Sequence, residues 1–264
     1  MNDPIETLDW EGREIDCAAC PQASLLASGG CKPRWSCVQD RYAPRIDRFF
    51  GQRRELAVDY IDHPYFEVRA ISAKFVDIFH LQRLRDDPDE TVRSMVALRL
   101  PQRPLLTMRN DPDREVRIRV AYRLAPETLD SMMHDTDYYV RTVVAKRLPP
   151  GMLPRMMHDP DVTVREQVAE RIDASQLPLM ADDPESSVRL ILARRLSPDQ
   201  LAILRHDDDW RVRYEVAQRI DPAYLVGMAR DDDEMVRELA RLRLAQTGAD
   251  SAQAQSLWRR YGED

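Results

Sequence analysis

Hydrophobic and polar positions recur along this chain with a period of 24 residues. A Val-Arg pair marks each repeat, with no insertion or deletion between pairs. The eight pairs are Val68-Arg69, Val92-Arg93, Val116-Arg117, Val140-Arg141, Val164-Arg165, Val188-Arg189, Val212-Arg213 and Val236-Arg237. A fixed period of this length is typical of proteins whose units stack only on their neighbours. The chain therefore contains eight copies of one structural unit.

Each repeat reads approximately Asp-Pro-Asp-x-x-Val-Arg-x-x-Val-Ala-x-Arg-Leu. Apolar residues follow the valine at intervals of four, five and eight positions, which places them on one face of a helix. In the third repeat we expect Asp111 to be the N-cap, Pro112 to lie in the first turn and Asp113 to sit at the positive end of the helix dipole. The pattern predicts an amphipathic helix of about three turns in every repeat.

A second, shorter apolar element follows each of these helices. Its two apolar residues are three positions apart: Leu105/Met108, Leu129/Met132, Leu153/Met156, Leu177/Met180, Leu201/Leu204 and Leu225/Met228. The segment is too short for an ordinary helix and predicts a single α or 3₁₀ turn. No repeat shows a strand pattern, so a single unit cannot bury a core alone. We therefore predict an all-α solenoid over residues 50–248, with divergent end units, and a tail over residues 249–264.

Arginine supplies almost all the positive charge, because only three of the 39 basic residues are lysines. In seven of the eight Val-Arg pairs the arginine follows an acidic residue by four positions, as in Asp89/Arg93, and this predicts ion pairs within one helix. A second column lies in the last helical turn, where cations complement the helix dipole. It comprises Arg99, Arg123, Arg147, Arg171, Arg195 and Arg219. The alternative is a groove in which these arginines bind phosphates or an acidic partner.

Charge and motifs exclude several classes of function. The net charge of −7 disfavours general binding to nucleic acid or to anionic membranes. No signal peptide or membrane-spanning segment is apparent, so we expect a cytoplasmic protein. No catalytic signature occurs in a supporting context, so we expect no enzyme activity.

Several other repeated side chains have simple expected places. We expect surface positions for His134, His158 and His206, and core positions for Met108, Met132, Met156, Met180 and Met228. Aromatic residues recur at one helical phase and are candidate contacts for a partner: Phe66, Tyr138 and Trp210.

All four cysteines of the chain, Cys17, Cys20, Cys31 and Cys37, lie within 21 consecutive positions. They define a small N-terminal domain, residues 1–49. Gly29 and Gly30 lie in the longer gap and allow the tight backbone turns that a metal centre requires. An apolar shell is expected from Pro21, Leu25, Leu26, Pro33 and Trp35, with Trp35 as a core residue of the domain.

Three interpretations of the cysteines remain open at this point. Two disulfides would suit an exported domain, but no export signal is apparent. A Cys₄ zinc site usually shows a second CxxC pair, whereas the second pair here is more widely spaced. The uneven spacing favours an iron–sulfur cluster, although spacing alone does not decide between iron and zinc.

The 24-residue units, joined to a four-cysteine segment, resemble the leucine-rich repeat variant family, and in particular its members with an iron–sulfur domain. The resemblance spans roughly Cys17 to Leu244. It implies a right-handed superhelix of alternating α and 3₁₀ helices and a [4Fe-4S] cluster on Cys17, Cys20, Cys31 and Cys37. Similar proteins are associated with nitrogen-fixing bacteria, and the family has no established reaction.

These features lead to one main functional hypothesis and two alternatives. The main hypothesis is a scaffold that binds a protein on its repeats, with a cluster that senses redox state or iron, or that is structural. One alternative is an electron-transfer protein that docks a redox partner. The other is a nucleic-acid clamp switched by its cluster.

Overall fold

The computed structural model describes residues 6–246, whose regular secondary structure is helical. Extended structure within this range is confined to two isolated bridges, Leu8 with Glu14 and Lys32 with Ser36. No helix in the same range is both long and apolar enough to cross a membrane. The chain divides into two compact units, Met1–Ser131 and Met132–Asp264. The predicted tail, residues 249–264, lies outside the described residues.

The first unit contains the cysteine segment and the first three repeats. Its elements are α1 (Ala23–Ala27), α2 (Ala43–Gln52), η1 (Arg54–Tyr60), α3 (Phe66–Ser72), α4 (Ile78–Leu81), η2 (Gln82–Leu84), α5 (Glu90–Ala97), α6 (Gln102–Thr107), η3 (Met108–Asn110) and α7 (Arg114–Arg123). Helix α2 packs on α3, α3 on α5, and α5 on α7. Helix α2 therefore continues the stack of repeat helices and runs across the predicted domain boundary at residue 49.

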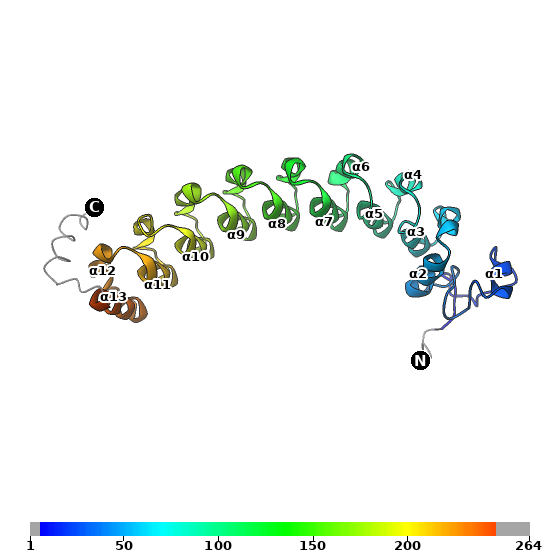
Figure 1. Cartoon of the computed structure of the whole chain (residues 1–264), viewed down its shortest axis with the longest axis horizontal. Helices are drawn as coiled ribbons and strands as arrows, with labels where there is room; N and C mark the ends of the chain where they lie inside the picture. The colour runs from blue at the N-terminus through cyan, green and yellow to red at the C-terminus, as the bar shows by residue number, and fades with distance from the viewer. Residues whose placement is uncertain (1–5, 247–264) are drawn as a thin grey trace. The chain divides into compact units, whose positions relative to one another are not determined.

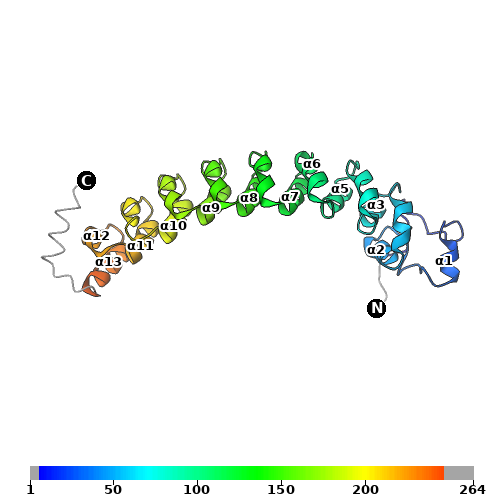
Figure 2. The same cartoon turned by 45° about the horizontal axis from the view of Figure 1, so that its top comes forward.

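The second unit consists of repeats alone. The element η4 (Pro126–Met132) runs across the division between the units. It is followed by α8 (Tyr138–Arg147), η5 (Pro150–Met156), α9 (Val162–Arg171), η6 (Ala174–Met180), α10 (Ser186–Arg195), η7 (Leu201–Leu204), α11 (Trp210–Arg219), α12 (Pro222–Met228) and α13 (Glu234–Gln246). The long helices of this unit lie side by side, and the short elements lie together on another side (Figures 1 and 2). The predicted alternation of long helices with α or 3₁₀ turns is confirmed.

The predicted apolar positions form the core. The valine of every Val-Arg pair is fully buried, as are the first leucines of the short elements, such as Leu153 and Leu177. The methionines at the second position are buried too, with Met108 and Met228 each 4% exposed. Each helix therefore buries one face against its neighbours, as the spacing of its apolar residues requires.

The helix caps differ from the prediction by two residues. Asp113, not Asp111, is the N-cap of α7, and its carboxylate accepts hydrogen bonds from the backbone N–H groups of Glu115 and Val116. Pro112 therefore precedes the helix. Asp111 accepts the N–H of Asp113 at 2.9 Å and turns its carboxylate toward the preceding repeat. The Asp-Pro-Asp motif offers two carboxylates, and only the second is close enough to the free N–H groups of the first turn.

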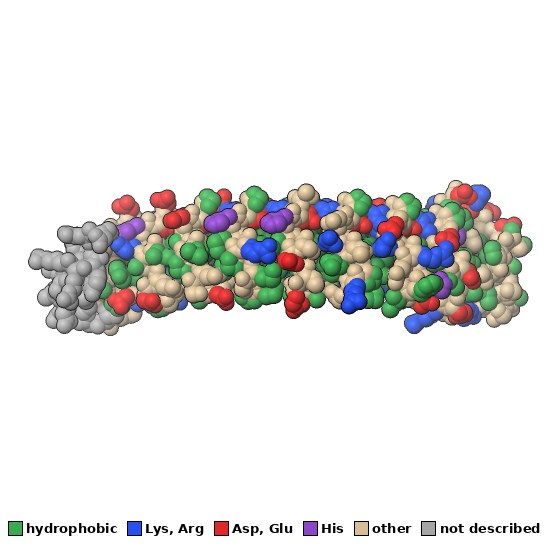
Figure 3. All heavy atoms as spheres, turned by 90° about the horizontal axis from the view of Figure 1, so that it is seen from above, with side chains coloured by type: hydrophobic (Ala, Val, Ile, Leu, Met, Phe, Trp, Pro, Cys, Tyr) green, Lys and Arg blue, Asp and Glu red, His purple; other side chains and the backbone are tan. Residues whose placement is uncertain are grey.

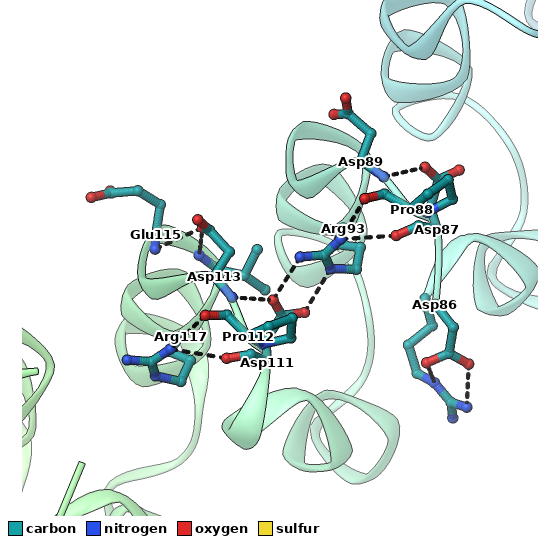
Figure 4. A network of polar contacts seen from close by, with 12 residues as sticks. Asp86, Asp87, Pro88, Asp89, Arg93, Asp111, Pro112, Asp113, Glu115 and Arg117 are labelled. Carbon is teal, nitrogen blue, oxygen red and sulfur yellow. Dashed lines mark hydrogen bonds and ion pairs between the residues drawn. The ribbon is translucent and has the colours of Figure 1, made fainter. Parts of the chain in front are cut away.

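The arginine of the Val-Arg pair joins two repeats, so the predicted pairing within one helix is wrong. Nε and Nη2 of Arg93 each donate to the carboxylate of Asp111 in the next repeat, at 2.9 Å (Figure 4). Nη1 of Arg93 donates to the carbonyl of Asp87 in its own repeat. Asp89, the expected partner, caps α5 instead.

The same bidentate pairing between arginine and aspartate recurs in both units. It joins Arg69 to Asp87, Arg141 to Asp159, Arg165 to Asp183, Arg189 to Asp207 and Arg213 to Asp231, with Nε–Oδ2 distances of 2.7 to 2.8 Å. Bidentate pairing of this kind suits the planar guanidinium and explains why arginine, rather than lysine, fills this column.

The second arginine column points back to the preceding repeat. Arg195 donates to the carbonyls of Ala169 at 2.6 Å and Ile172 at 2.8 Å, which lie at the C-terminal end of α9. Equivalent bonds to the residue 26 positions earlier are made by Arg99, Arg123, Arg171, Arg219 and Arg243. The predicted match between cation and helix dipole therefore applies to the preceding helix. These guanidinium groups bind the backbone, which counts against the alternative of a phosphate-binding groove.

Candidate metal centre

The four cysteines lie on three short stretches of the first unit. Cys17 and Cys20 precede α1, Cys31 follows it, and Cys37 precedes α2. All four are free thiols, and Cys37 is buried whereas the other three are partly exposed. The structure therefore gives no support to the disulfide interpretation.

A tight turn after α1 returns the chain toward the first two cysteines. Gly29 has a φ of +71°, the left-handed conformation expected of a glycine at this point. Gly30 serves a different purpose, because a Cβ atom there would lie 2.8 Å from Nη2 of Arg53 and 3.2 Å from Leu25. The N–H groups of Gly30 and Cys31 both donate to the carbonyl of Leu25. This close packing fixes where Cys31 leaves the turn.

Cys37 is held against α2. Its N–H donates to the carbonyl of Arg45 at 3.2 Å. Arg45 in turn pairs with Asp40 at 2.9 Å, and both side chains are at most 1% exposed. A fully buried ion pair thus holds the backbone around Cys37 in place.

Burial and mutual charge oppose ionisation of the thiols. Burial raises the pKa of Cys37 to about 12, and the charges of Asp40, Cys20 and Cys17 act in the same direction, while the Gln39 backbone opposes them. Burial also raises the pKa of Cys31, again with contributions from Cys20 and Cys17. Cys17 and Cys20 therefore lie within electrostatic reach of both other thiols. Thiolates gathered in this way require a compensating cation, which suits a metal centre.

The described residues contain no ready-made group of donors for one metal ion. Within residues 6–246, no three His, Cys, Asp or Glu side chains are close enough to hold a single ion. Four thiolates around one zinc ion each lie about 2.3 Å from it and must almost touch. A polynuclear cluster places several metal atoms between its ligands, so its four thiols lie farther apart than those of a zinc site.

Two buried hydroxyl groups near Cys37 lack hydrogen-bond partners among the described residues. They are Oγ of Ser36, which precedes Cys37 in the chain, and the hydroxyl of Tyr60, at the end of η1. Buried donors normally find a partner, so each such exception needs a cause. Sulfur atoms of an iron–sulfur cluster accept hydrogen bonds, and such a cluster fits a site with unused donors.

The predicted apolar shell is largely wrong. Leu26 is 40% exposed and Trp35 is 54% exposed, and Pro21 also lies at the surface. Trp35 is not a core residue, because its ring stacks against the guanidinium of Arg48 at 3.8 Å from the ring centroid. The segment is too small to surround a tryptophan, and the apolar material comes instead from α2 and η1.

Phe50 and Tyr60 provide part of that material. Phe50 is fully buried, and its ring centroid lies 5.6 Å from that of Tyr60. Sequence reasoning missed Tyr60 because it lies beyond the cysteine segment and belongs to no motif. Its aromatic ring and its place just before the first repeat were the only signals.

The other predicted positions agree with the structure in most cases. His134, His158 and His206 are exposed, and histidines are visible on the face of the short elements (Figure 3). Tyr138 and Trp210 are each 45% exposed, whereas Phe66 is half-buried.

Two family models match this chain. Residues 7–59 match the model described as the LRV protein FeS4 cluster, and residues 138–161 match the leucine-rich repeat variant model. The first match contains all four cysteines and the second contains one complete repeat.

One solved structure and one curated protein are also similar to it. The structure, titled "A leucine-rich repeat variant with a novel repetitive protein structural motif", is 43% identical, with a TM-score of 0.80 over 87% of this chain and 99% of that one. The curated protein is the "Uncharacterized 27.7 kDa protein in nifB 3'region" of Rhodobacter capsulatus, 48% identical over 101 residues. That alignment spans 38% of this chain and 41% of the relative.

Proposed function

Because this chain belongs to the leucine-rich repeat variant family and carries that family's iron–sulfur domain, we propose that it is a protein-binding scaffold with a [4Fe-4S] cluster. The partner surface lies on the repeats, and the cluster lies on Cys17, Cys20, Cys31 and Cys37. The position of the Rhodobacter capsulatus relative in a nifB 3' region supports a role linked to nitrogen fixation.

Large apolar side chains exposed at repeated positions carry the scaffold proposal. Tyr138 and Trp210 occupy the same place in repeats three periods apart, and each is 45% exposed. Leu179 and Ile203 are one period apart on η6 and η7, and they are 65% and 51% exposed. Aromatic and large apolar residues in such positions are enriched at protein interfaces.

Charge around this surface favours a basic partner. Beside Ile203 lies a hollow of about 410 Å³ that is lined by Asp182, Asp183, Asp207 and Asp208. We call the pairs between Val-Arg arginines and the aspartates of the next repeat the arginine ladder. Through it Arg165 binds Asp183 and Arg189 binds Asp207, so the remaining two carboxylates supply the net negative charge. We therefore propose a partner that presents apolar side chains flanked by lysine or arginine.

Crosslinking and affinity capture from the native host test the scaffold proposal. We expect a reproducible partner that is retained by the full chain and lost on Trp210→Ala or Ile203→Ser. Gln218→Ala is the matched control, because Gln218 is an exposed residue of the same helix, α11. Equal retention by all variants, or loss with Gln218→Ala alone, contradicts the proposed surface.

Metal analysis after anaerobic purification tests the cluster. We expect iron and acid-labile sulfide in equal amounts, little zinc, and a visible spectrum that dithionite changes reversibly. Cys37→Ser removes the most deeply buried ligand, so we expect it to lose most of the iron. Zinc without sulfide would reduce this domain to a structural zinc site and leave only the scaffold.

Electron transfer is the second candidate, and the exposure of the site favours it. Cys17, Cys20 and Cys31 are only partly buried, so a cluster bound to them would lie near the surface, where a redox partner could reach it. A bound cluster supplies one-electron transfer. Reversible cycling at a physiological potential, with rates that fall when the repeat surface is altered, would favour this function over a purely structural cluster.

A further inference from the structure

Tyr60 has a buried hydroxyl with no hydrogen-bond partner among the described residues. The residue is only 7% exposed and lies at the end of η1, 23 positions after the last cysteine. Its ring is fixed on two sides, by Phe50 at 5.6 Å and by His63 at 5.9 Å between centroids. The fold therefore holds this hydroxyl in one place without using it.

Packing places Tyr60 against the helix that holds Cys37, because its ring packs on Phe50 of α2 and the carbonyl of Arg45 on the same helix accepts the N–H of Cys37. Burial raises the pKa of Tyr60, and the charges of Cys20, Asp59 and Cys37 raise it further, so two of the four thiols lie within electrostatic reach. The Gln22 side chain is also near and acts in the opposite direction, yet it does not complete a hydrogen bond of good geometry. A buried phenol within electrostatic reach of two thiols, with its donor unused, suits an acceptor that is bound by those thiols.

We propose that Tyr60 donates its hydroxyl hydrogen to a sulfur atom of the bound cluster and thereby sets its reduction potential. This inference rests on the proposed cluster. Reduction adds negative charge to the cluster, and a hydrogen bond to sulfur stabilises that charge. Tyr60 is a positioning and tuning residue in this role, since it is not a ligand.

Tyr60→Phe is the test, because it removes one oxygen atom and keeps the ring. We expect the variant to take up iron and sulfide as the wild type does and to show a more negative midpoint potential. We also expect a smaller shift of the Fe–S stretching frequencies between H₂O and D₂O. The cluster-free variant should melt at the same temperature as the cluster-free wild type, or higher, because the lost hydroxyl had no partner there.

Tyr65→Phe is the matched control. Tyr65 lies five residues away, and its hydroxyl already donates to the carbonyl of Arg41 at 3.1 Å, so its removal should leave the potential unchanged. An unchanged potential in Tyr60→Phe, or an equal shift in both variants, overturns the inference. A lower melting temperature of cluster-free Tyr60→Phe overturns it too, because the hydroxyl would then have a partner in the empty fold.

Two remaining outcomes are also decisive. If cluster-free Tyr60→Phe melts normally but retains less cluster than Tyr65→Phe, the potential of the retained cluster decides: a more negative value supports the inference, and an unchanged value overturns it. If the wild type itself contains no sulfide, the cluster proposal fails first, and metal analysis of the wild type shows this before any variant is compared.

Discussion

Asp159 and Asp161 are two residues apart and stabilise different parts of the fold. Asp159 accepts hydrogen bonds from Nε and Nη2 of Arg141 in the preceding repeat. It also accepts a hydrogen bond from the backbone N–H of Asp161. Asp161 caps α9 through the N–H of Thr163. One carboxylate joins two repeats and the other begins a helix, so their removal should have unequal costs.

We expect Asp159→Ala to cost about 3 kcal/mol of unfolding free energy, because it leaves the buried guanidinium of Arg141 without its carboxylate. Asp161→Ala should lower the unfolding free energy by about 1 kcal/mol, as is usual when an N-cap is lost. Urea denaturation of both variants measures the difference. Equal costs, or a greater cost for Asp161→Ala, would contradict the stabilising role of the pair between Asp159 and Arg141.

His63 occupies the place in the first repeat that an aspartate holds in the others. Its Nδ1 accepts the N–H of Tyr65 at 3.1 Å, as the aspartates accept the N–H two residues on, and its ring packs on Trp10 at 4.5 Å. Burial lowers the pKa of His63, and the positive charge of Arg69 acts in the same direction. The fold therefore favours the neutral imidazole.

Acid should consequently weaken the first unit. The unfolded chain takes up a proton near pH 6.5 while the folded chain resists it, so the contribution of His63 is complete above that pH and is lost as the pH falls below it. Thermal melts at pH 7.5 and 5.5 should show a smaller drop for His63→Asn than for the wild type. His134→Asn, at an exposed site, should leave the wild-type drop unchanged.

At the scale of elements, several long helices are joined to their neighbours by two arginines that point in opposite directions, as α9 illustrates. Arg165 reaches forward to Asp183, and Arg171 of the same helix, α9, reaches back to the carbonyl of Ala145. The valines and leucines provide the attraction between helices, and the arginines fix the offset at which they stack.

We expect Arg165→Ala to lower the unfolding free energy by about 3 kcal/mol, because Asp183 stays buried without a partner. Arg194→Ala is the control, since its pair with Glu215 lies at the surface and should contribute less than about 1 kcal/mol. Chemical denaturation followed by circular dichroism compares them. Similar losses for the two variants would show that the ladder adds no more than an ordinary surface pair.

Much of the arrangement of the helices could be predicted from the sequence. The predictions that were wrong concern contacts between repeats, and the reason is physical. The spacing of Val116, Val120 and Ala121 predicts the buried face because helix geometry alone determines it. The partner of Arg93 was not readable, because Asp111 is 18 residues away and approaches only when two repeats stack. Tyr60 was missed for the same reason, as nothing local connects it to Cys20 or Cys37.

The whole molecule carries a net charge of −7 although it has 36 arginines and three lysines. Many of those arginines are engaged by aspartates or by backbone carbonyls, as Arg93 and Arg195 illustrate. These guanidinium groups join neighbouring repeats and are therefore not free to bind phosphates.

We accordingly expect no appreciable affinity for DNA or RNA. Fluorescence anisotropy with short single- and double-stranded oligonucleotides, at low and at physiological salt, measures this. A cluster-loaded and a cluster-free sample should both fail to bind. Binding that weakens steeply with added salt in either sample would contradict the prediction and revive the nucleic-acid clamp.

The forward and backward reach of the arginines also constrains how this chain can evolve. Duplication or deletion of a whole 24-residue unit leaves the arginines at the same offset from their carboxylate and carbonyl acceptors. The array can therefore change length by complete units. An insertion of a single residue within a repeat shifts one donor away from its acceptor and leaves both buried. The arginine contacts thus select against insertions and deletions that are not whole repeats. This agrees with the unbroken period of the eight repeats.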